Sequence, residues 1–422
     1  MPTVFVIFGI TGDLANRKII PALLALHVKT LLPVRFAILG FSRKSFTDDE
    51  FRSYLRAHLI LPAGAFSDAQ ITEFLDNVFF QHGAYDNTVS YRELSERITK
   101  IETVFGARAN KIFHLSVPPT THHDIISALG TSGLSTSTKD AWTRILIEKP
   151  FGTDTKTAHA LNKLLLRFFT EEQIFRIDHY LAKESLQHFP EFHFPGGSLE
   201  PFWNRTHIEK VHIQLLETAG VENRGEFYDG VGALRDVVQN HMLEMLALTA
   251  MKKPRSENAK DVRAARAKVL KCLAPVKNGV KQVTRGQYEH YAQEAGVAPQ
   301  SRTETYVRLE AFLKLWRFRG VPFLLETGKR MKESRTSIDV YFKHDIPGMG
   351  KVFSFDVKRK TNSGMLSDYE RIIHDALLGV QTLFASQDEV MAEWKFITPI
   401  LKHWNSLPLM RYTSADIVEK EA

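Results

Sequence analysis

The segment Arg176–Glu184 (RIDHYLAKE) is dense in side chains that could bind an anion. If this segment is helical, His179 and Lys183 lie four residues apart on one face and present two donors suited to a phosphate monoester. Asp178 then points about 100° away and could orient a different group. A salt-bridged surface helix has the same composition, so both interpretations stay open on the residues alone.

A second polar cluster, Arg235–His241 (RDVVQNH), opens a helical pattern over 236–251. A single histidine at the start of an apolar helix is usually a hydrogen-bonded core residue. A histidine paired with a carboxylate, however, makes a general base near neutral pH. His241 is therefore a candidate base.

The apolar run 4–8 leads directly into a Gly-x-x-Gly-x-x-Ala turn and then a helical pattern. Glycines let a backbone turn sharply and approach a pyrophosphate, whose charge meets the free N–H groups of the helix start. The turn lacks one glycine of the usual dinucleotide pattern, and a ligand-free tight turn also fits it. Its place at the first strand–helix turn favours a dinucleotide. The candidate cofactor residues here are Gly9, Thr11, Gly12, Asp13 and Leu14.

The second apolar run ends in Gly40–Lys44 (GFSRK). NAD enzymes usually carry a carboxylate here that holds the ribose 2′-hydroxyl, whereas Arg43 offers a planar cationic fork suited to a 2′-phosphate. An exposed surface arginine is the plain alternative. Together with the turn, Arg43 favours NADP as cofactor, with NAD binding more weakly.

Apolar runs and helical patterns alternate in the first third of the chain, which indicates a parallel sheet covered on both faces. The strand-like runs are 4–8, 35–40, 111–117 and 143–148, and helical patterns occupy 17–29 and 48–59. Later runs at 208–217, 305–315 and 336–343 partly alternate, as half-buried antiparallel strands do. We predict an α/β protein with a Rossmann-type domain over residues 1–175 and an α+β domain over 176–422.

Composition excludes several classes of protein. The 422 residues include 55 Lys+Arg, 48 Asp+Glu and one cysteine, so an internal disulfide and a zinc site with two thiolates are excluded. The single cysteine favours a cytoplasmic location. The N-terminus lacks a basic leader, and no apolar stretch reaches the ~18 residues that cross a bilayer, so we expect no membrane partner.

The segment Lys252–Arg285 holds eleven of the basic residues and only two acidic ones. A polyanion-binding patch would need interleaved aromatic residues, which are lacking, so we favour a solvated helix face and expect no nucleic acid. That helix would bury Val262, Ala265, Val269 and Leu273. We also expect no metal site, because the adjacent His122 and His123 read as surface histidines at a helix start.

Five blocks resemble the glucose-6-phosphate dehydrogenase family in order and approximate spacing. They are GITGDLA (9–15), IEKPFG (147–152), RIDHYLAKE (176–184), RDVVQNH (235–241) and GVPFLLETGKRM (320–331). The third block is highly specific to that family, whereas EKP is shared with other sugar dehydrogenases. Weaker similarity over 202–217 and 375–390 extends the resemblance to nearly the whole chain.

The resemblance implies NADP-dependent oxidation of D-glucose 6-phosphate to 6-phospho-D-glucono-1,5-lactone, the first step of the oxidative pentose phosphate pathway. His241 matches the base that takes the C1 hydroxyl proton during hydride transfer, and Asp178 matches its orienting partner. The substrate-binding positions match His179, Tyr180, Lys183, Lys149, Glu217, Asp236, Lys329 and Lys18. The cofactor positions match Gly9, Thr11, Gly12, Asp13, Leu14, Arg43, Pro118 and Lys149. Pro150 matches a cis-proline of the family.

Some positions depart from the family pattern. Asn16 stands where a lysine is common, which would weaken contacts to the cofactor phosphates. Glu326 replaces an arginine near the sugar site, in the region where animal members carry a second, structural NADP, and we expect none here. The chain also lacks a long stretch of the family's large, mainly antiparallel sheet near 343–347. That stretch belongs to the sheet used in family homodimers and homotetramers, so the sequence leaves the oligomeric state open. We expect the C-terminal tail or a partner to cover the edge that the deletion creates.

Two other functions fit the same scaffold. One is a dehydrogenase of another sugar or sugar phosphate, which a comparison of glucose with glucose 6-phosphate would reveal. The other is a catalytically silent regulatory relative. Retention of Asp178, His241, Lys149, Lys183 and Lys329 together argues against the silent relative.

Overall fold

The computed structural model describes residues 1–276, 282–357 and 365–413, which form two compact units. The first unit comprises Met1–Gly152, Lys156–Ala182 and a later segment that contains α11 and β13. The second comprises Thr153–Thr155, the chain from Lys183 through β12, and the chain from Ser386 onward. The chain therefore leaves the first unit, builds most of the second, and returns once before it ends.

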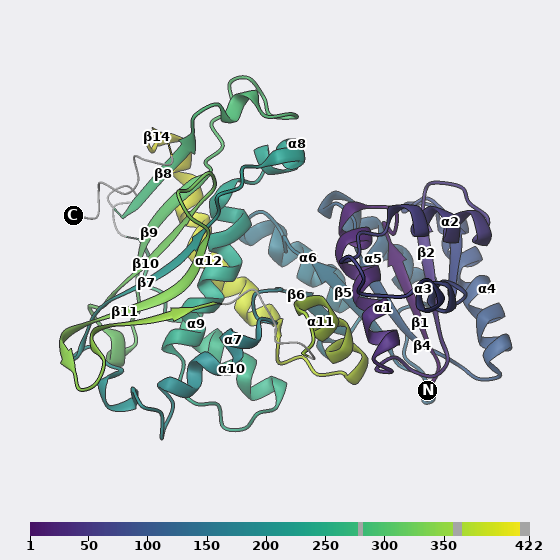
Figure 1. Cartoon of the computed structure of the whole chain (residues 1–422), viewed down its shortest axis with the longest axis horizontal. Helices are drawn as coiled ribbons and strands as arrows, with labels where there is room; N and C mark the ends of the chain where they lie inside the picture. The colour runs from purple at the N-terminus through teal and green to yellow at the C-terminus, as the bar shows by residue number, and fades with distance from the viewer. Residues whose placement is uncertain (277–281, 358–364, 414–422) are drawn as a thin grey trace. The chain divides into compact units, whose positions relative to one another are not determined.

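The first unit is built on a seven-stranded sheet in the order β13-β6-β5-β4-β1-β2-β3 (Figure 1). Its strands are β1 (Thr3–Phe8), β2 (Phe36–Ser42), β3 (Val78–His82), β4 (Asn110–Leu115), β5 (Thr143–Glu148), β6 (Ile174–Ile177) and β13 (Phe384–Ala385). All neighbours are parallel except β13, which pairs antiparallel with β6. This is the Rossmann order, with its topological switch point between β1 and β4. The predicted parallel sheet is confirmed.

Helices cover both faces of this sheet. They are α1 (Ile20–Val28), α2 (Asp48–His58), α3 (Asp68–Leu75), α4 (Thr88–Phe105), α5 (His122–Thr131), α6 (Thr155–Phe168) and α11 (Asp368–Leu378). α1, α2, α3 and α11 share one apolar core with the sheet, while α4, α5 and α6 pack on the other side. Local signals set their ends: Thr47 and Glu50 form a capping box on α2, and Gly106 ends α4 with a left-handed φ of 65°.

The second unit contains a mixed seven-stranded sheet in the order β12-β11-β7-β10-β9-β8-β14. Its strands are β7 (Ile208–Leu216), β8 (Val283–Tyr288), β9 (Tyr306–Phe312), β10 (Pro322–Gly328), β11 (Arg335–Ile346), β12 (Gly350–Asp356) and β14 (Leu409–Tyr412). The β7–β10 and β8–β14 pairs are parallel and the other pairs antiparallel. The sheet is therefore mainly antiparallel, as the resemblance implies.

The second unit also contains several helices among its described residues. They are α7 (Glu184–His188), α8 (Gly225–Asp229), α9 (Leu243–Ala250), α10 (Ala259–Lys271) and α12 (Gln387–Lys402). A π-helical segment, Leu234–Met242, runs into α9 and contacts β7, β9 and β10. The helix expected over 236–251 is thus present, with its first half wound more loosely than an α-helix.

The basic helix α10 differs from its prediction. Its buried face includes Arg263 and Arg266, while Val262 and Ala265 are only partly buried. Arg266 is 1% exposed, and its Nε lies 2.6 Å from Glu389 Oε1 and 3.2 Å from Glu244 Oε2. The buried carboxylates of Glu244 and Glu389 thus pair with an arginine on the inner face of the helix. Periodicity of apolar residues alone does not reveal this orientation. Residues 277–281 of the basic segment lie outside the described residues.

The deletion falls at the hairpin between β11 and β12, which leaves β12 as an edge strand of the sheet. Among the described residues, no strand of the C-terminal tail pairs with this edge, and the expectation that the tail or a partner covers it stays a prediction. β14 pairs with β8 at the opposite edge. Residues 414–422 lie outside the described residues.

The histidines at the start of α5 were both predicted to be at the surface. His123 is exposed, with 76% of its side chain accessible, but His122 is only 2% exposed. Burial lowers the pKa of His122 to about 4. The prediction for His122 was wrong because the helix begins at that residue and turns its first side chain inward.

Candidate active site

The glycine turn follows β1 at the carboxyl edge of the parallel sheet. Gly9 has φ +76°, its N–H donates to the carbonyl of Phe41 (3.0 Å), and its carbonyl accepts from Gly12 N–H (2.9 Å). A Cβ at Gly9 would lie 2.2 Å from the carbonyl oxygen of Ser116. The turn thus lies so close to the backbone at the end of β4 that a side chain at position 9 would not fit. This fits a dinucleotide, whose pyrophosphate needs such a close backbone approach.

The other residues of this turn and of the helix that follows it differ in how exposed they are. Tyr54 donates to the carbonyl of Thr11 (3.3 Å), and Leu14 packs on the apolar core. Asp13 and Arg17 form an exposed ion pair at 2.5 Å. Lys18 is exposed on the short π-helical segment Ala15–Ile19. Asn16, where a lysine is common, is buried.

Arg43 directly follows β2 and is exposed. Its guanidinium carbon lies 5.8 Å from the ring centroid of Tyr85. Burial raises the pKa of Tyr85, while the positive charge of Arg43 opposes that rise. Tyr85 also belongs to an aromatic cluster with Phe8 and Phe41. Sequence reasoning missed Tyr85; its only signal was an aromatic residue in the polar segment after β3.

The predicted residues Pro118 and Lys149 lie after the next two parallel strands. Pro118 is exposed beyond β4, and Lys149 follows β5 directly. Glu148, at the end of β5, lies 3.2 Å from His114 Nε2 and accepts from Tyr369 (3.2 Å), which fixes the backbone before Lys149. The Lys149–Pro150 peptide bond is cis, as the resemblance implied.

The segment after β6 is not the helix that its spacing suggested. Residues 178–183 form turns, and α7 begins only at Glu184. Asp178 Oδ1 accepts from the backbone N–H of Tyr180 (2.9 Å), and the carbonyl of Asp178 accepts from Leu181 N–H (3.1 Å). An aspartate that bonds its own backbone two residues on stabilises a turn at the expense of a helix. The prediction that His179 and Lys183 share a helix face was therefore wrong.

These turns nevertheless fix the candidate side chains. Asp178 is 2% exposed, Tyr180 8% and Lys183 8%, while His179 is half-buried with its ring 5.0 Å from that of Tyr180. The boundary between the units falls between Ala182 and Lys183. Asp178, His179 and Tyr180 thus belong to the first unit, and Lys183 precedes α7 of the second.

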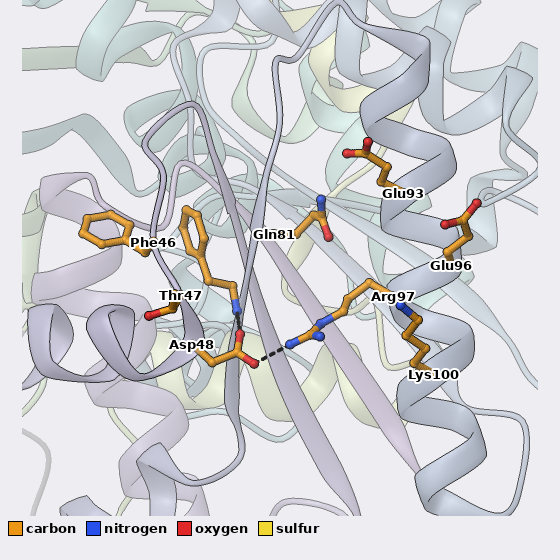
Figure 2. Close-up of a pocket in the computed structure, with 9 residues that line it drawn as sticks. Phe46, Thr47, Asp48, Gln81, Glu93, Glu96, Arg97 and Lys100 are labelled. Carbon is orange, nitrogen blue, oxygen red and sulfur yellow. Dashed lines mark hydrogen bonds and ion pairs between the residues drawn. The ribbon is translucent and has the colours of Figure 1, made fainter.

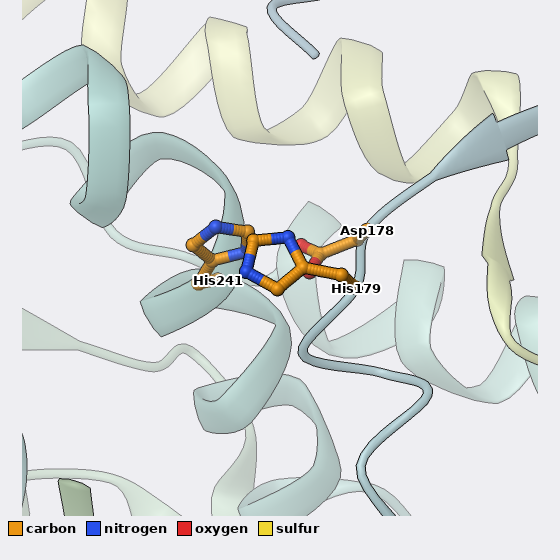
Figure 3. A group of neighbouring side chains, drawn as sticks. All are labelled: Asp178, His179 and His241. Carbon is orange, nitrogen blue, oxygen red and sulfur yellow. The ribbon is translucent and has the colours of Figure 1, made fainter. Parts of the chain in front are cut away.

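His241 lies in the second unit, on the π-helical segment Leu234–Met242. Figure 3 shows His241 on this helical ribbon, and Asp178 and His179 on the chain that follows β6. His241 is 2% exposed, and its backbone N–H donates to Asn240 Oδ1 (2.7 Å). π-Helical segments occur frequently at functional sites. Carboxylates and imidazoles are also common metal ligands, so the absence of a metal site stays a prediction.

Glu217 and Lys329 meet in the second unit. They follow β7 and β10, which are parallel neighbours with Leu216 opposite Gly328. Because both strands end at the same edge, the two side chains come together, with Lys329 Nζ 2.5 Å from Glu217 Oε2. The pair is partly exposed, at 13% and 29% of the side chains, so a ligand could reach it.

Asp236 joins this group through Tyr228, a residue that sequence reasoning missed. Lys329 Nζ lies 5.3 Å from the ring centroid of Tyr228. Burial raises the pKa of Tyr228 well above its usual range, and the negative charges of Asp236 and Glu304 add to that rise. Lys329 therefore lies over a buried phenol whose pKa also responds to the charge of Asp236. No spacing rule pointed to Tyr228, because it lies in a short helix, α8, outside the five blocks.

Glu326, the residue that replaces an arginine, is 3% exposed within the sheet. It accepts hydrogen bonds from Tyr306 (2.6 Å) and Gln214 (3.3 Å) and lies 2.8 Å from His212 Nε2. Burial alone would raise the pKa of Glu326, but its hydrogen bonds with His212 and Tyr306 lower it to about 2. This carboxylate stabilises β10 three residues before Lys329.

The first unit also contains a cavity of about 430 Å³ away from the glycine turn (Figure 2). It lies among α2, β3 and α4, and its charged residues are Asp48, Glu93, Glu96, Arg97 and Lys100. Asp48 pairs with Arg97 and accepts from the backbone N–H of Phe80 (2.8 Å). These contacts connect α2, β3 and α4, so the residues around the cavity hold these three elements together.

Two family models match this chain. The NAD binding domain of glucose-6-phosphate dehydrogenase matches residues 6–188, and the C-terminal domain of the same enzyme matches residues 191–351 and 347–422. The second match is split at the hairpin where the deletion was inferred. Among the described residues, no helix has both the length and the apolar character needed to cross a bilayer.

Curated proteins and solved structures give a consistent picture. The chain is 37% identical over 446 residues to glucose-6-phosphate 1-dehydrogenase of Aggregatibacter actinomycetemcomitans, covering 94% of this chain and 90% of that one. A solved glucose-6-phosphate dehydrogenase in complex with glucose 6-phosphate superposes with a TM-score of 0.87 at 29% identity, covering 99% and 96%. The enzyme from Mycobacterium avium gives 0.85 at 30% identity, covering 98% and 95%.

Proposed function

The chain belongs to the glucose-6-phosphate dehydrogenase family, and on that premise we propose that its two units together oxidise D-glucose 6-phosphate at C1. The first unit binds NADP and the second provides most of the substrate site. The product is 6-phospho-D-glucono-1,5-lactone. The observation that carries this proposal is the match of the family models to nearly the whole chain, within which segment 176–184 keeps its anion-binding side chains.

His241 acts as the general base. Its imidazole takes the proton of the C1 hydroxyl, so that the electrons of the C1–H bond can leave as hydride while the C1–O bond becomes a carbonyl. Asp178 accepts a hydrogen bond from the imidazole and stabilises the imidazolium that forms. Its turn hydrogen bond from Tyr180 N–H supports this role, because that bond fixes the carboxylate before substrate arrives.

The remaining residues bind and orient the substrate. His179, Tyr180 and Lys183 hold the phosphate, whose charge suits two cationic donors and a hydroxyl. Lys18, Lys149, Glu217, Asp236 and Lys329 hold the sugar hydroxyls. The Glu217–Lys329 ion pair supports this assignment, because it leaves an acceptor and a donor side by side at a partly exposed edge.

The glycine turn and the ends of β2, β4 and β5 bind the dinucleotide. Gly9 and Gly12 allow the pyrophosphate to approach the backbone, with Thr11, Asp13 and Leu14 in the same turn. Arg43 pairs with the 2′-phosphate and sets the preference for NADP over NAD. Pro118 and Lys149 also bind the cofactor, and Pro150 lies beside the nicotinamide. NADP supplies the hydride acceptor when it is bound.

The assay that tests this function follows the absorbance of reduced nicotinamide. With NADP, glucose 6-phosphate should give a kcat/KM at least about 100-fold above that of glucose, because two charge-assisted contacts to the phosphate are each worth about 1.5–3 kcal/mol. Equal rates with the two sugars would show that 179–183 does not bind phosphate. No reaction with either sugar would refute the dehydrogenase assignment itself.

The partners and the cellular location of this protein stay predictions. We expect a cytoplasmic enzyme without nucleic-acid or membrane partners. The family homodimer or homotetramer would lose part of its sheet through the deletion at the β11–β12 hairpin. Light scattering of the full chain measures whether an oligomer remains.

A further inference from the structure

Glu304 is a buried carboxylate that neither the family motifs nor the proposed mechanism uses. It precedes β9 in the second unit and is 4% exposed. Its Oε1 accepts from the backbone N–H of Leu234 (3.0 Å), and its Oε2 accepts from the indole N–H of Trp404 (2.9 Å). Burial raises the pKa of Glu304, and these two donors oppose that rise. Both oxygens therefore have partners from distant parts of the chain.

The partner Leu234 is the first residue of the π-helical segment that carries Asp236 and His241. The carbonyl of Glu304 also accepts from the N–H of Ala233 (3.1 Å). Gly232, with φ +74°, makes this approach possible, because a Cβ there would lie 2.4 Å from Glu304 Oε1. Backbone and side chain of one residue thus fix the start of this segment.

The next residue, Thr305, performs the same task for Lys329. Its carbonyl accepts from the backbone N–H of Lys329 (3.0 Å). The phenol of Tyr412 donates to the carbonyl of Lys329 (2.6 Å) and lies 2.9 Å from Thr305 Oγ1. Thr305 is 0% exposed and Tyr412 1%. Lys329 is thereby fixed on both sides of its backbone.

We propose that Glu304 is a positioning residue for the reaction, and that Trp404 and Tyr412 complete a clamp with Glu304 and Thr305. This 304–305 clamp joins the start of the His241 segment to the backbone of Lys329. It sets the distance between the base and a sugar-binding lysine within one unit. The inference rests on the proposed function, in which His241 and Lys329 act on one sugar.

The C-terminal residues give the clamp its particular form. Trp404 follows α12, and Tyr412 ends β14, which is parallel to β8 at the sheet edge. Arg285 fixes the chain between them, because its guanidinium donates to the carbonyl of Leu407 (3.0 Å) and lies 5.4 Å from the Trp404 ring centroid. The last described strand is therefore a structural part of the proposed sugar site.

The test compares Glu304→Gln, Trp404→Phe and Tyr412→Phe with wild type, using glucose 6-phosphate and NADP. Glutamine cannot accept from both donors, so one partner of the clamp is released. We expect Glu304→Gln to lower kcat about tenfold and raise KM for glucose 6-phosphate about tenfold, because displacements of about 1 Å at a reacting centre cost up to about 100-fold. The KM for NADP should stay within about twofold, since the cofactor belongs to the other unit.

Tyr291→Phe is the matched control. Tyr291 belongs to the same buried aromatic cluster as Tyr412, but its hydroxyl donates to Asp229 (3.0 Å), outside the clamp. Its kcat and both KM values should remain within about twofold of wild type. Hydrogen exchange gives a readout besides activity: the amides of Leu234 and Lys329 should exchange faster in the clamp variants than in Tyr291→Phe.

Three results would overturn the inference. One is unchanged kcat and KM for glucose 6-phosphate in Glu304→Gln; another is equal loss in the Tyr291→Phe control; the third is a rise of both KM values together. If Glu304→Gln does not fold, Trp404→Phe and Tyr412→Phe decide the matter, since each removes one donor and keeps an aromatic side chain in place. Failure of the proposed function looks different, because wild type itself would then not oxidise glucose 6-phosphate.

Discussion

The two units position their functional residues by different means. In the first unit, the candidate residues follow the carboxyl ends of parallel strands, and the key contacts are made by backbone atoms at Gly9 and Gly12. In the second unit, buried side chains do this work: Glu304 fixes the His241 segment, and Glu326 stabilises β10 beside Lys329. One unit depends on the absence of a side chain, and the other on particular buried ones.

The difference has energetic consequences. A glycine turn fails when any Cβ is added, because the colliding atom is backbone and cannot move aside cheaply. A buried carboxylate no longer stabilises the fold when its hydrogen-bond donors or its charge are removed. The resulting loss of unfolding free energy then depends on pH. The two units should therefore respond to different kinds of mutation, which three experiments can test.

Gly9→Ala should have the largest effect on the first unit. The new Cβ would lie 2.2 Å from the Ser116 carbonyl, at a φ of +76° that alanine disfavours by about 1–2 kcal/mol. We expect NADP to bind about 100-fold more weakly or worse, since the turn must move away from the pyrophosphate. Fluorescence titration with reduced NADP measures this.

Gly64→Ala is the control for backbone strain alone. Gly64 has a φ of +70°, but its added Cβ would meet nothing within 4 Å. This variant should lose about 1 kcal/mol of stability and bind NADP normally. If the two alanine variants bind NADP equally well, the close approach at Gly9 does not matter.

Glu326→Gln should alter how acid affects the second unit. The folded pKa of Glu326, about 2, lies below its ordinary value of 4.5. Its contribution to stability is therefore complete above about pH 4.5 and is lost as the pH falls toward 2. We expect the free energy of unfolding of wild type, measured by urea denaturation, to fall more steeply over this range than that of Glu326→Gln. The difference should be on the order of 1–3 kcal/mol.

Tryptophan fluorescence suits this measurement, because Trp203, Trp316, Trp394 and Trp404 belong to the second unit. Glu73→Gln is the control, since the Glu73 side chain is 73% exposed in the first unit. Parallel curves for wild type and Glu326→Gln would mean that buried charge does not stabilise this sheet.

Arg43→Ala should have the smallest effect on cofactor binding, because Arg43 is exposed and belongs to the first unit, where backbone atoms make the key contacts. We expect NADP to bind about tenfold more weakly and NAD to bind unchanged, since only NADP carries the 2′-phosphate. Lys44→Ala, one residue on, is the control for general surface charge. An equal loss for both cofactors would refute the 2′-phosphate assignment.

The same difference explains what the sequence could predict about the fold. The buried parallel strands are continuous apolar runs, so β1, β2, β4 and β5 were located to within two residues. The short strands β3 and β6 and the return of the chain through α11 and β13 were not foreseen, since runs of four or five residues resemble many helical fragments. In the second unit, β7, β9, β11, the His241 helix and α10 had a readable pattern.

For the candidate site, sequence reasoning proposed residues that lie in short blocks. These are the glycine turn, Arg43 after the second strand, the 178–183 segment and His241, and their roles stay predictions. Tyr85, Tyr228, Glu304 and Tyr412 lie in no such block, because their roles arise from contacts between residues far apart in the chain. The helix assumed for 178–183 failed for a local reason, since the side chain of Asp178 competes for the Tyr180 N–H.

The central claim is that Asp178 and His241 act as one base couple on the substrate C1 hydroxyl. A double-mutant cycle of kcat for His241→Asn, Asp178→Asn and the double variant tests it most directly. We predict that His241→Asn lowers kcat by about 10²–10⁴-fold and that the double variant is no slower than His241→Asn alone, as for residues that act as a unit. Losses that simply multiply, or near wild-type kcat in His241→Asn, would contradict the account.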